Sequence, residues 1–264
     1  MSFTIKLRSK NPSARDLKIG LSHVSCSSPI LVRLGSRTPI EQIFPRSHSR
    51  AIEINSVEGI TNSRNKLLMK QCFNNGEVRT AEWAGLNDST NWNIFPAIIK
   101  QLGSHGGEGI FMINNMDELL GFWEHHQNHS NYIIEKYYNY TKEYRLHVTK
   151  DGCFYTCRKM LKSDASDRWH RHDNNCVWIL EDNPLFERPS NWPEIEAECV
   201  KALHSVGLDT GACDVKVQSE KGKRSSFIPD FIILEINSAP SMGEITTIKY
   251  LEKLTKIISE YDTK

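Results

Sequence analysis

One stretch near the end of the chain, residues 227–242, restricts the fold more than any other. Its apolar run, residues 231–234, is typical of a buried strand and ends in Glu235-x-Asn237, followed by small residues and a proline. Because side chains alternate along a strand, Glu235 and Asn237 share one face and their apolar neighbours share the other. Two oxygen donors at a strand end suit a hard cation such as Mg²⁺. An ordinary strand end whose polar residues enter a turn is the alternative, and this stretch by itself favours it.

Length and composition set the class of protein. A chain of 264 residues allows one large domain or two or three lobes that share a core. With 33 Lys and Arg against 32 Asp and Glu, the net charge of +1 gives no global attraction to nucleic acid or membrane. No apolar run reaches the roughly 20 residues of a membrane helix, and the N-terminus lacks a secretory signal. We therefore expect a cytoplasmic protein whose seven scattered cysteines are reduced thiols.

The periodicity of apolar residues predicts an α+β protein with mainly antiparallel sheets. Helices are expected at about 62–73, 116–127, 191–206 and 244–261. Strands are expected at 30–34, 51–54, 95–100, 109–113, 132–136, 143–149, 153–160, 212–217 and 228–236. Residues 162–176 are polar and basic and are expected to form a long loop. Residues 1–60 contain too few apolar residues for a core of their own and should pack on the later part of the chain.

A glycine-rich segment follows the strand that Lys100 closes. Four glycines fall within seven residues: Gly103, Gly106, Gly107 and Gly109, with Ser104 among them. Such a segment lets backbone N–H groups approach a polyphosphate closely. It is not a Walker loop, because no Gly-Lys-Ser/Thr opens a helix, and a kinase lysine would follow the loop rather than precede it. A flexible hairpin tip remains the alternative, and the lysine facing the segment weighs against it.

A second set of polar residues follows the strand at 132–136. Glu135-Lys-Tyr-Tyr138 could place backbone groups and a carboxylate beside an adenine edge. Glu143 and Arg145 share one strand face, which suits a ribose hydroxyl and a phosphate. Aromatic-rich strands more often belong to a core, so this segment is unspecific by itself.

The order of these pieces resembles the ATP-grasp superfamily, in particular its RimK-like carboxylate–amine ligases, over about residues 60–260. Residues 62–66 are similar to the Ser-Arg-Asp-Lys helix start of that family, with Asn65 in place of the acid. The resemblance implies an ATP-grasp fold, in which two α+β lobes with mainly antiparallel sheets grip ATP. The expected division is a short N-terminal lobe at 1–60, a central lobe with the glycine-rich loop at 61–130, and a C-terminal lobe with the metal site at 131–264.

The resemblance also implies which residues hold ATP. Lys66 and Lys100 would contact the phosphates, and the 103–109 loop would close over them. The residues implied for the nucleoside are Glu135, Lys136 and Tyr138 around the adenine and Glu143 at the ribose.

The implied metal ligands are Asp214, Glu235 and Asn237, for one or two Mg²⁺ ions or for Mn²⁺ in their place. Asp214 precedes the 219–226 hairpin loop and the other two follow it, so pairing of the two strands can bring all three to one face. The same parity argument places three further side chains on that face: Ala212, Phe231 and Ile233. It places Asp230 on the opposite face, and we exclude this acid from the site.

The reaction implied by the resemblance is amide or peptide bond formation. A substrate carboxylate would attack the γ-phosphate of ATP to give an acyl phosphate and ADP, and an amine would then displace phosphate. The carboxylate and the amine could belong to small molecules, amino acids or peptides. The candidates for stabilising the transferring phosphoryl group are Arg145, Arg158 and Lys159, and Arg158 is favoured because its strand runs toward the loop. A solvated surface arginine is the competing interpretation of Arg158.

Three alternatives stay open. A nucleotide-binding regulatory module without turnover would use the same residues. The basic segment 158–172, with Trp169 within it, could bind an acidic substrate or single-stranded nucleic acid, or could be a solvated loop, and Asn174–Asn175 could orient substrate. A zinc site would use Cys153, Cys157, His170, His172 and Cys176, whose spacing departs from a structural knuckle. The identity of the substrates and the oligomeric state are not encoded in any motif.

Overall fold

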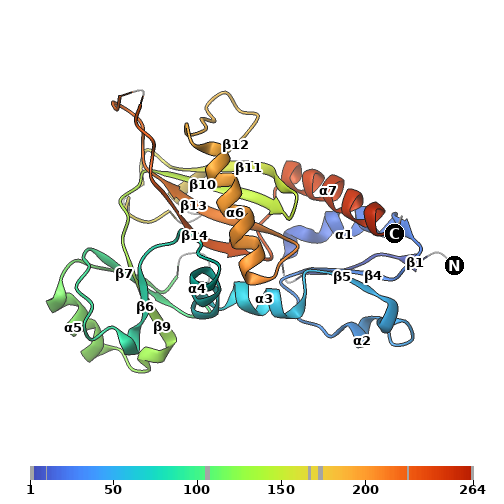
Figure 1. Ribbon diagram of the computed structural model, residues 1–264, viewed down its shortest axis with the longest axis horizontal. Coiled ribbons are helices and arrows are strands. Elements are labelled where there is room, and N and C mark those ends of the chain that lie inside the picture. The colour runs from blue at the N-terminus through green and yellow to red at the C-terminus, as the bar shows by residue number, and fades with distance from the viewer. Residues whose placement is uncertain are drawn as a thin grey trace.

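The computed structural model describes residues 3–9, 11–104, 108–165, 168–171, 175–224 and 226–262. Three lobes follow one another along the long axis of the molecule, each built on a sheet of its own (Figure 1). Both termini lie at the same end, where the first and last helices meet (Figure 1). The five-stranded sheet occupies the middle of the molecule, between the three-stranded and the four-stranded sheets (Figure 1). A fourth sheet is the antiparallel pair of residues 3–4 with residues 25–26.

Helices separate short groups of strands, and four strands follow one another between residues 132 and 180. The strands are β1 (Phe3–Thr4), β2 (Lys6–Ser9), β3 (Ser25–Cys26), β4 (Ile30–Leu34), β5 (Ile52–Ile54), β6 (Trp83–Gly85), β7 (Ala97–Gln101), β8 (Ile110–Ile113), β9 (Tyr132–Lys136), β10 (Lys142–Thr149), β11 (Gly152–Leu161), β12 (Cys176–Leu180), β13 (Thr210–Val217) and β14 (Phe231–Asn237). The α-helices are α1 (Arg15–Ser22), α2 (Ile40–Ile43), α3 (Val57–Arg64), α4 (Lys66–Asn75), α5 (Met116–His125), α6 (Trp192–Val206) and α7 (Glu244–Asp262). Single 3₁₀ turns lie at Pro12–Ala14, His48–Arg50, Leu86–Asp88 and His129–Asn131.

The N-terminal sheet is parallel, with strand order β2-β4-β5. Every residue of β4 is buried, as expected for a central parallel strand covered on both faces. The core beneath it includes Leu17 and Leu21 of α1 together with Tyr250 and Leu254 of α7. The first 60 residues therefore do pack on later ones, as the sequence predicts. Strand β2 and helix α1 were not predicted.

The central lobe carries an antiparallel sheet of order β6-β9-β7-β8, covered by α5. Helix α5 begins after Asn115, whose side-chain oxygen accepts a hydrogen bond from the backbone N–H of Glu118 at 2.9 Å. Leu119 and Phe122 of this helix are buried against Ile99 and Ile134 of the sheet. Burial of each of these side chains stabilises the fold by about 1.5–3 kcal/mol.

The large antiparallel sheet has the order β12-β11-β10-β13-β14. Helix α6 lies across one face with α3 and α4 beside it (Figure 1), and Ile195 and Leu203 of α6 are fully buried there. The helix ends at Gly207, whose left-handed φ of 78° suits glycine, as the sequence predicts. The opposite face of the sheet carries the polar residues of the candidate site.

The helix expected at 62–73 and the loop expected at 162–176 both differ from the prediction. The predicted helix at 62–73 is two helices, because Asn65 is extended and its side chain caps α4 by accepting from the N–H groups of Leu67 and Leu68 at 2.9 and 3.3 Å. Strand β12 was not predicted, and it begins at Cys176, the last residue of the expected loop. The lobe boundaries stay a prediction, although α4 packs under the large sheet and β9 belongs to the central one.

Two further findings bear on the class of protein. All seven cysteines are free, in agreement with the expectation of reduced thiols. Within the described ranges, no helix combines the length and the apolar character needed to cross a membrane.

Candidate active site

A cavity of about 510 Å³ lies where the three lobes meet. Among its described lining residues, seven carry a cationic side chain and four carry a carboxylate. The cations are Arg64, Lys66, Lys100, Arg145, Lys159, Arg171 and Lys216. The carboxylates are Glu108, Glu143, Asp214 and Glu235. The apolar part of the lining is made by Met69, Ile98, Ile110 and Leu234. We call this cavity the main pocket.

The three predicted metal ligands lie together on β13 and β14. These strands pair antiparallel, with Asp214 opposite Glu235 and Ala212 opposite Asn237. The Asn237 side-chain nitrogen lies 3.0 Å from Glu235 Oε1 and 3.3 Å from Asp214 Oδ2. Two carboxylates and one amide therefore converge at one edge of the main pocket.

The prediction of which β14 side chains share the face of Asp214 is wrong for the residues before Glu235. The register shifts between Asp214 and Val215, so that Val215 pairs with Ile233 and Leu234 is the extra residue of a bulge. Ile233 and Phe231 consequently face the core under α6 instead of sharing the face of Asp214. The bulge also turns Leu234 into the main pocket.

Arg145 lies opposite Asp214 on the neighbouring strand β10. Its Nε and Nη2 donate to the two oxygens of Asp214 at 2.7 and 2.8 Å, and its guanidinium lies 4.8 Å from the centre of the Trp178 ring. Burial alone would raise the pKa of Asp214, but the Arg145 guanidinium outweighs it and holds that pKa below its usual value. Asp214 is therefore an anion, as a metal ligand must be.

Lys66 and the glycine-rich segment meet at the mouth of the main pocket. Lys66 opens α4, and its Nζ donates to the backbone oxygen of Ser104 at 2.8 Å. Burial lowers the pKa of Lys66. Gly109 has a left-handed φ of 64°, and a Cβ there would lie 2.8 Å from the side chain of Gln101, so only glycine fits. Gly103 also has a left-handed φ, of 78°. Gly106 and Gly107 lie outside the described residues.

Behind the main pocket, Lys100 belongs to a buried group of three charges. Its Nζ lies 2.9 Å from Glu135 Oε2, and Lys70 Nζ lies 3.4 Å from Glu135 Oε1. Lys70 also donates to Thr80 Oγ1 at 2.6 Å. Burial would raise the pKa of Glu135, but the two lysines hold it below its usual value, whereas burial lowers the pKa of Lys70 to about 8. Lys70 was not predicted, although its place one helical turn after Lys66 puts it on the same side of α4.

The side chains implied for the adenine do not line the main pocket. Glu135 points inward to the two lysines just described, and strand alternation turns Lys136 outward. Lys136 and Tyr138 both bind Glu82, at 3.0 and 2.6 Å. These two side chains fasten β9 to the segment before β6, and their assignment to the adenine stays a prediction.

Glu143, the residue implied for the ribose, lines the main pocket and is buried. It lies opposite Lys159 on one side and Lys216 on the other, and Arg171 Nη1 is 3.8 Å from its carboxylate. Burial raises the pKa of Glu143, and burial lowers the pKa of Lys216 to about 8. Lys216 was missed, yet its position two residues after Asp214 on one strand was sufficient to find it.

Arg158 does not line the main pocket, whereas Lys159 does, so the structure gives no support to the preference for Arg158. Arg158 pairs with Tyr144 and Lys159 with Glu143, so the two side chains leave opposite faces of the sheet. The Arg158 guanidinium lies 3.5 Å from Glu187 and 6.0 Å from the centre of the Tyr144 ring. Lys159 and Arg145 remain the candidates for contact with a phosphoryl group.

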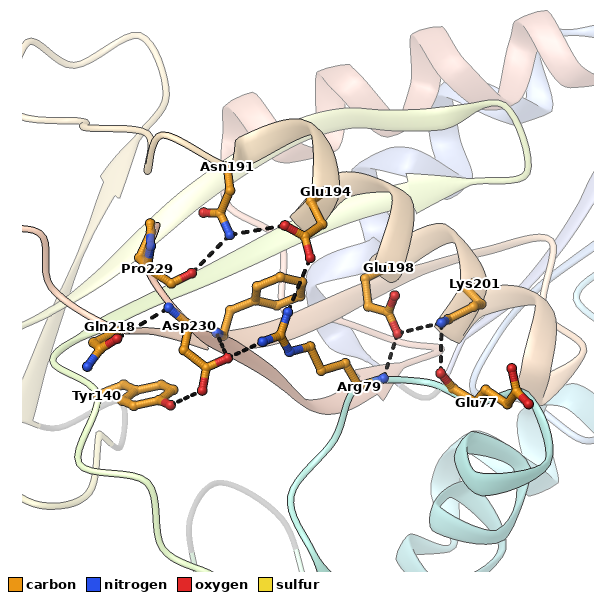
Figure 2. Close-up of polar contacts among 11 residues, drawn as sticks. Glu77, Arg79, Tyr140, Asn191, Glu194, Glu198, Lys201, Gln218, Pro229 and Asp230 are labelled. Atoms are coloured by element: carbon orange, nitrogen blue, oxygen red, sulfur yellow. Dashed lines mark hydrogen bonds and ion pairs between the residues drawn. The ribbon is translucent and has the colours of Figure 1, made fainter. Parts of the chain in front are cut away.

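Asp230 lies away from the main pocket, as its exclusion requires. Figure 2 shows it between Arg79 and Tyr140, both of which donate to its carboxylate. Arg79 also donates to Glu194 of α6 at 3.2 Å. Arg79 and Tyr140 lie on the two segments that connect the central and large sheets, so Asp230 fastens both connections.

The zinc alternative receives no support from the described residues. Among them, no group of three His, Cys, Asp or Glu side chains is placed to hold a metal ion. Burial raises the pKa of Cys153 and of Cys157 to about 12, which disfavours the thiolate that zinc requires. His172 and Asn174 lie outside the described residues, and Asn175 donates to the His170 carbonyl at 2.9 Å.

Comparisons with known proteins give structural matches only. No family model matches the sequence, and no curated protein matches it. The structure is similar to the ATP-grasp ligase PsnB complexed with minimal precursor, with a TM-score of 0.63 and 13% identity over 97% of this chain and 99% of that one. It is also similar to D-alanine–D-alanine ligase from Bacillus anthracis complexed with ATP, with a TM-score of 0.59 and 14% identity over 88% and 81% of the two chains.

A third match is N5-carboxyaminoimidazole synthetase from Staphylococcus aureus complexed with ADP, with a TM-score of 0.57 and 16% identity. The match covers 80% of this chain and 54% of that one, so the chain spans about half the length of that protein. None of these likenesses distinguishes the RimK-like group within the superfamily. Together with the antiparallel sheets that flank the main pocket, they show that this chain has the ATP-grasp fold.

Proposed function

We propose that this protein binds ATP in the main pocket and uses it to join a carboxylate to an amine. The observation that carries the proposal is the charge of the pocket: seven cations face four carboxylates, whereas the whole chain has a net charge of only +1. A polyphosphate is the anion that such a concentration of lysine and arginine suits. Solved structures of the same fold hold ATP or ADP, which supports the proposal.

Each part of the nucleotide has a matching part of the lining. The phosphates would lie between Lys66 and Lys100, with the backbone of the glycine-rich segment over them. The base would lie against Ile98 and Leu234, because an apolar surface suits its flat faces. The buried carboxylate of Glu143 would accept from a ribose hydroxyl.

The donor set at the edge of the pocket fits Mg²⁺. Asp214 and Glu235 supply carboxylates, and the amide of Asn237 presents its oxygen after a half turn about its last bond. The ion, or Mn²⁺ in its place, would neutralise charge on the phosphate oxygens. This assignment uses three protein ligands, so phosphate oxygens and water must complete the octahedral coordination that Mg²⁺ requires.

The chemistry requires charge neutralisation more than a protein nucleophile. A substrate carboxylate would attack the γ-phosphate to give an acyl phosphate and ADP, and an amine would then displace phosphate to form an amide. Lys159 and Arg145 would stabilise the charge of the transferring group, because both side chains line the main pocket. The RimK-like group is the part of the superfamily to which this proposal assigns the chain.

The test is turnover of Mg-ATP in the presence of pools of amino acids and peptides, followed as ADP, phosphate and product mass. Lys100→Met should abolish turnover, because it removes a buried cation of the main pocket. Lys249→Met, which changes an exposed lysine paired with Glu252, is the matched control and should leave turnover intact. Formation of AMP and pyrophosphate would contradict the acyl-phosphate mechanism. Binding of ADP without turnover of any pool would favour a nucleotide-binding regulatory module instead.

A further inference from the structure

A second pocket of about 350 Å³ adjoins the main pocket. Lys159 and Arg171 line both, so the two pockets share a wall. Among the described residues of its lining, every charged side chain is cationic: Arg158, Lys159, Arg168 and Arg171. Two acids that are not part of this lining each bind one of its arginines: Glu143 binds Arg171, and Glu187 binds Arg158. The second pocket therefore has a stronger cationic excess than the main one.

One of its arginines keeps a buried donor unused. Arg171 Nε has no hydrogen-bond partner among the described residues. The Arg171 side chain is only 7% exposed, and its other nitrogens are engaged by Glu143 at 3.8 Å and by the Thr141 carbonyl at 2.7 Å. A buried N–H without an acceptor is costly, so the Arg171 Nε–H points to an acceptor that a ligand brings.

We propose that the second pocket binds a carboxylate of the substrate other than the one that is activated, so that the substrate is an acidic peptide. This inference rests on the proposed function, which already requires a carboxylate substrate. The planar guanidinium of arginine matches a carboxylate through two parallel hydrogen bonds. Because the pockets share Lys159 and Arg171, one extended chain can place one carboxylate in each.

The test is calorimetric titration of tetraglutamate into the protein saturated with Mg-ADP, which occupies the main pocket. Wild-type protein should bind tetraglutamate and should not bind tetraglutamine. Arg168→Gln should weaken tetraglutamate binding about tenfold, the usual effect of losing one charge-assisted contact. Arg168 is exposed, so its replacement leaves folding intact. Arg188→Gln is the matched control, because Arg188 is a 47% exposed arginine paired with Glu181 outside both pockets.

Several outcomes would overturn the inference. These are absence of tetraglutamate binding, equal weakening by Arg188→Gln and Arg168→Gln, or tighter binding of oligothymidylate than of tetraglutamate. The last result would assign the pocket to single-stranded nucleic acid. Binding of ADP in the same samples tests the proposed function separately. Bound ADP with no peptide contradicts this inference alone, whereas absence of ADP binding contradicts the proposed function.

Discussion

The buried pair between Arg145 and Asp214 gives the most quantitative prediction. The two side chains are 14% and 12% exposed and are joined by two hydrogen bonds of 2.7 and 2.8 Å. Removing one partner of such a pair costs about 3–5 kcal/mol, because the other charge is left buried and unpaired. We expect Asp214→Asn and Arg145→Met each to lower the free energy of unfolding by about 3 kcal/mol. The double variant should lose no more than either single variant.

The assay is urea unfolding of the four proteins, followed by tryptophan fluorescence and analysed as a double-mutant cycle. The exposed pair of Lys249 and Glu252 is the comparison, and Lys249→Met should cost less than about 1 kcal/mol. If the two single losses add within about 0.5 kcal/mol in the double variant, the pair does not couple and the reasoning is refuted.

The same pair predicts a pH dependence with a definite sign. Arg145 holds the pKa of Asp214 below its ordinary value of 3.8 in the folded protein. The stabilisation is therefore present above about pH 4 and is lost as the pH falls through the lower, folded pKa. The stability difference between wild type and the double variant should be constant from about pH 5 to 7 and should change only in more acidic solution.

The remaining predictions concern the edges of the site. Glu235→Gln should weaken binding of Mg-ADP at least tenfold while leaving metal-free ADP binding unchanged, which calorimetry with and without EDTA measures. Burial lowers the pKa of Lys216 to about 8, so wild-type stability should rise with pH between about 8 and 10.5, and Lys216→Met should flatten that rise in urea unfolding. Asp230→Asn should leave turnover within about twofold. Arg79→Met should cost less than about 1 kcal/mol, because the ion pairs of Arg79 are 38–55% exposed. A larger loss of turnover in Asp230→Asn would contradict its placement outside the site, and a larger stability cost of Arg79→Met would contradict the weakness of its exposed ion pairs.

The sequence predicted those features whose signal is local. The apolar run before Glu235 predicted β14, and Asp-Gly at 151–152 predicted the turn between β10 and β11. Both inferences required only a run of neighbouring residues. The exclusion of Asp230 agrees with its place outside the main pocket, but the alternation behind it does not hold, because the bulge at Leu234 puts Phe231 on the core face.

Features that depend on tertiary contacts escaped prediction. The bulge at Leu234 moved Phe231 and Ile233 to the core face, and nothing in the sequence marks it. Lys136 and Tyr138 turned to Glu82, a residue that the chain brings near only when β6 and β9 pair. Strands β4 and β5 of the N-terminal sheet were predicted, but β2 and α1 escaped, because they bury their apolar residues against α7, more than 200 residues later.

The central claim is that the main pocket holds a nucleotide, and a crystal structure of the protein with Mg-ADP tests it most directly. The account predicts phosphates in contact with Lys66 and Lys100, the base against Ile98, and the metal ion at the edge formed by β13 and β14. Nucleotide bound elsewhere on the molecule, or a main pocket that stays empty at saturating Mg-ADP, would contradict it.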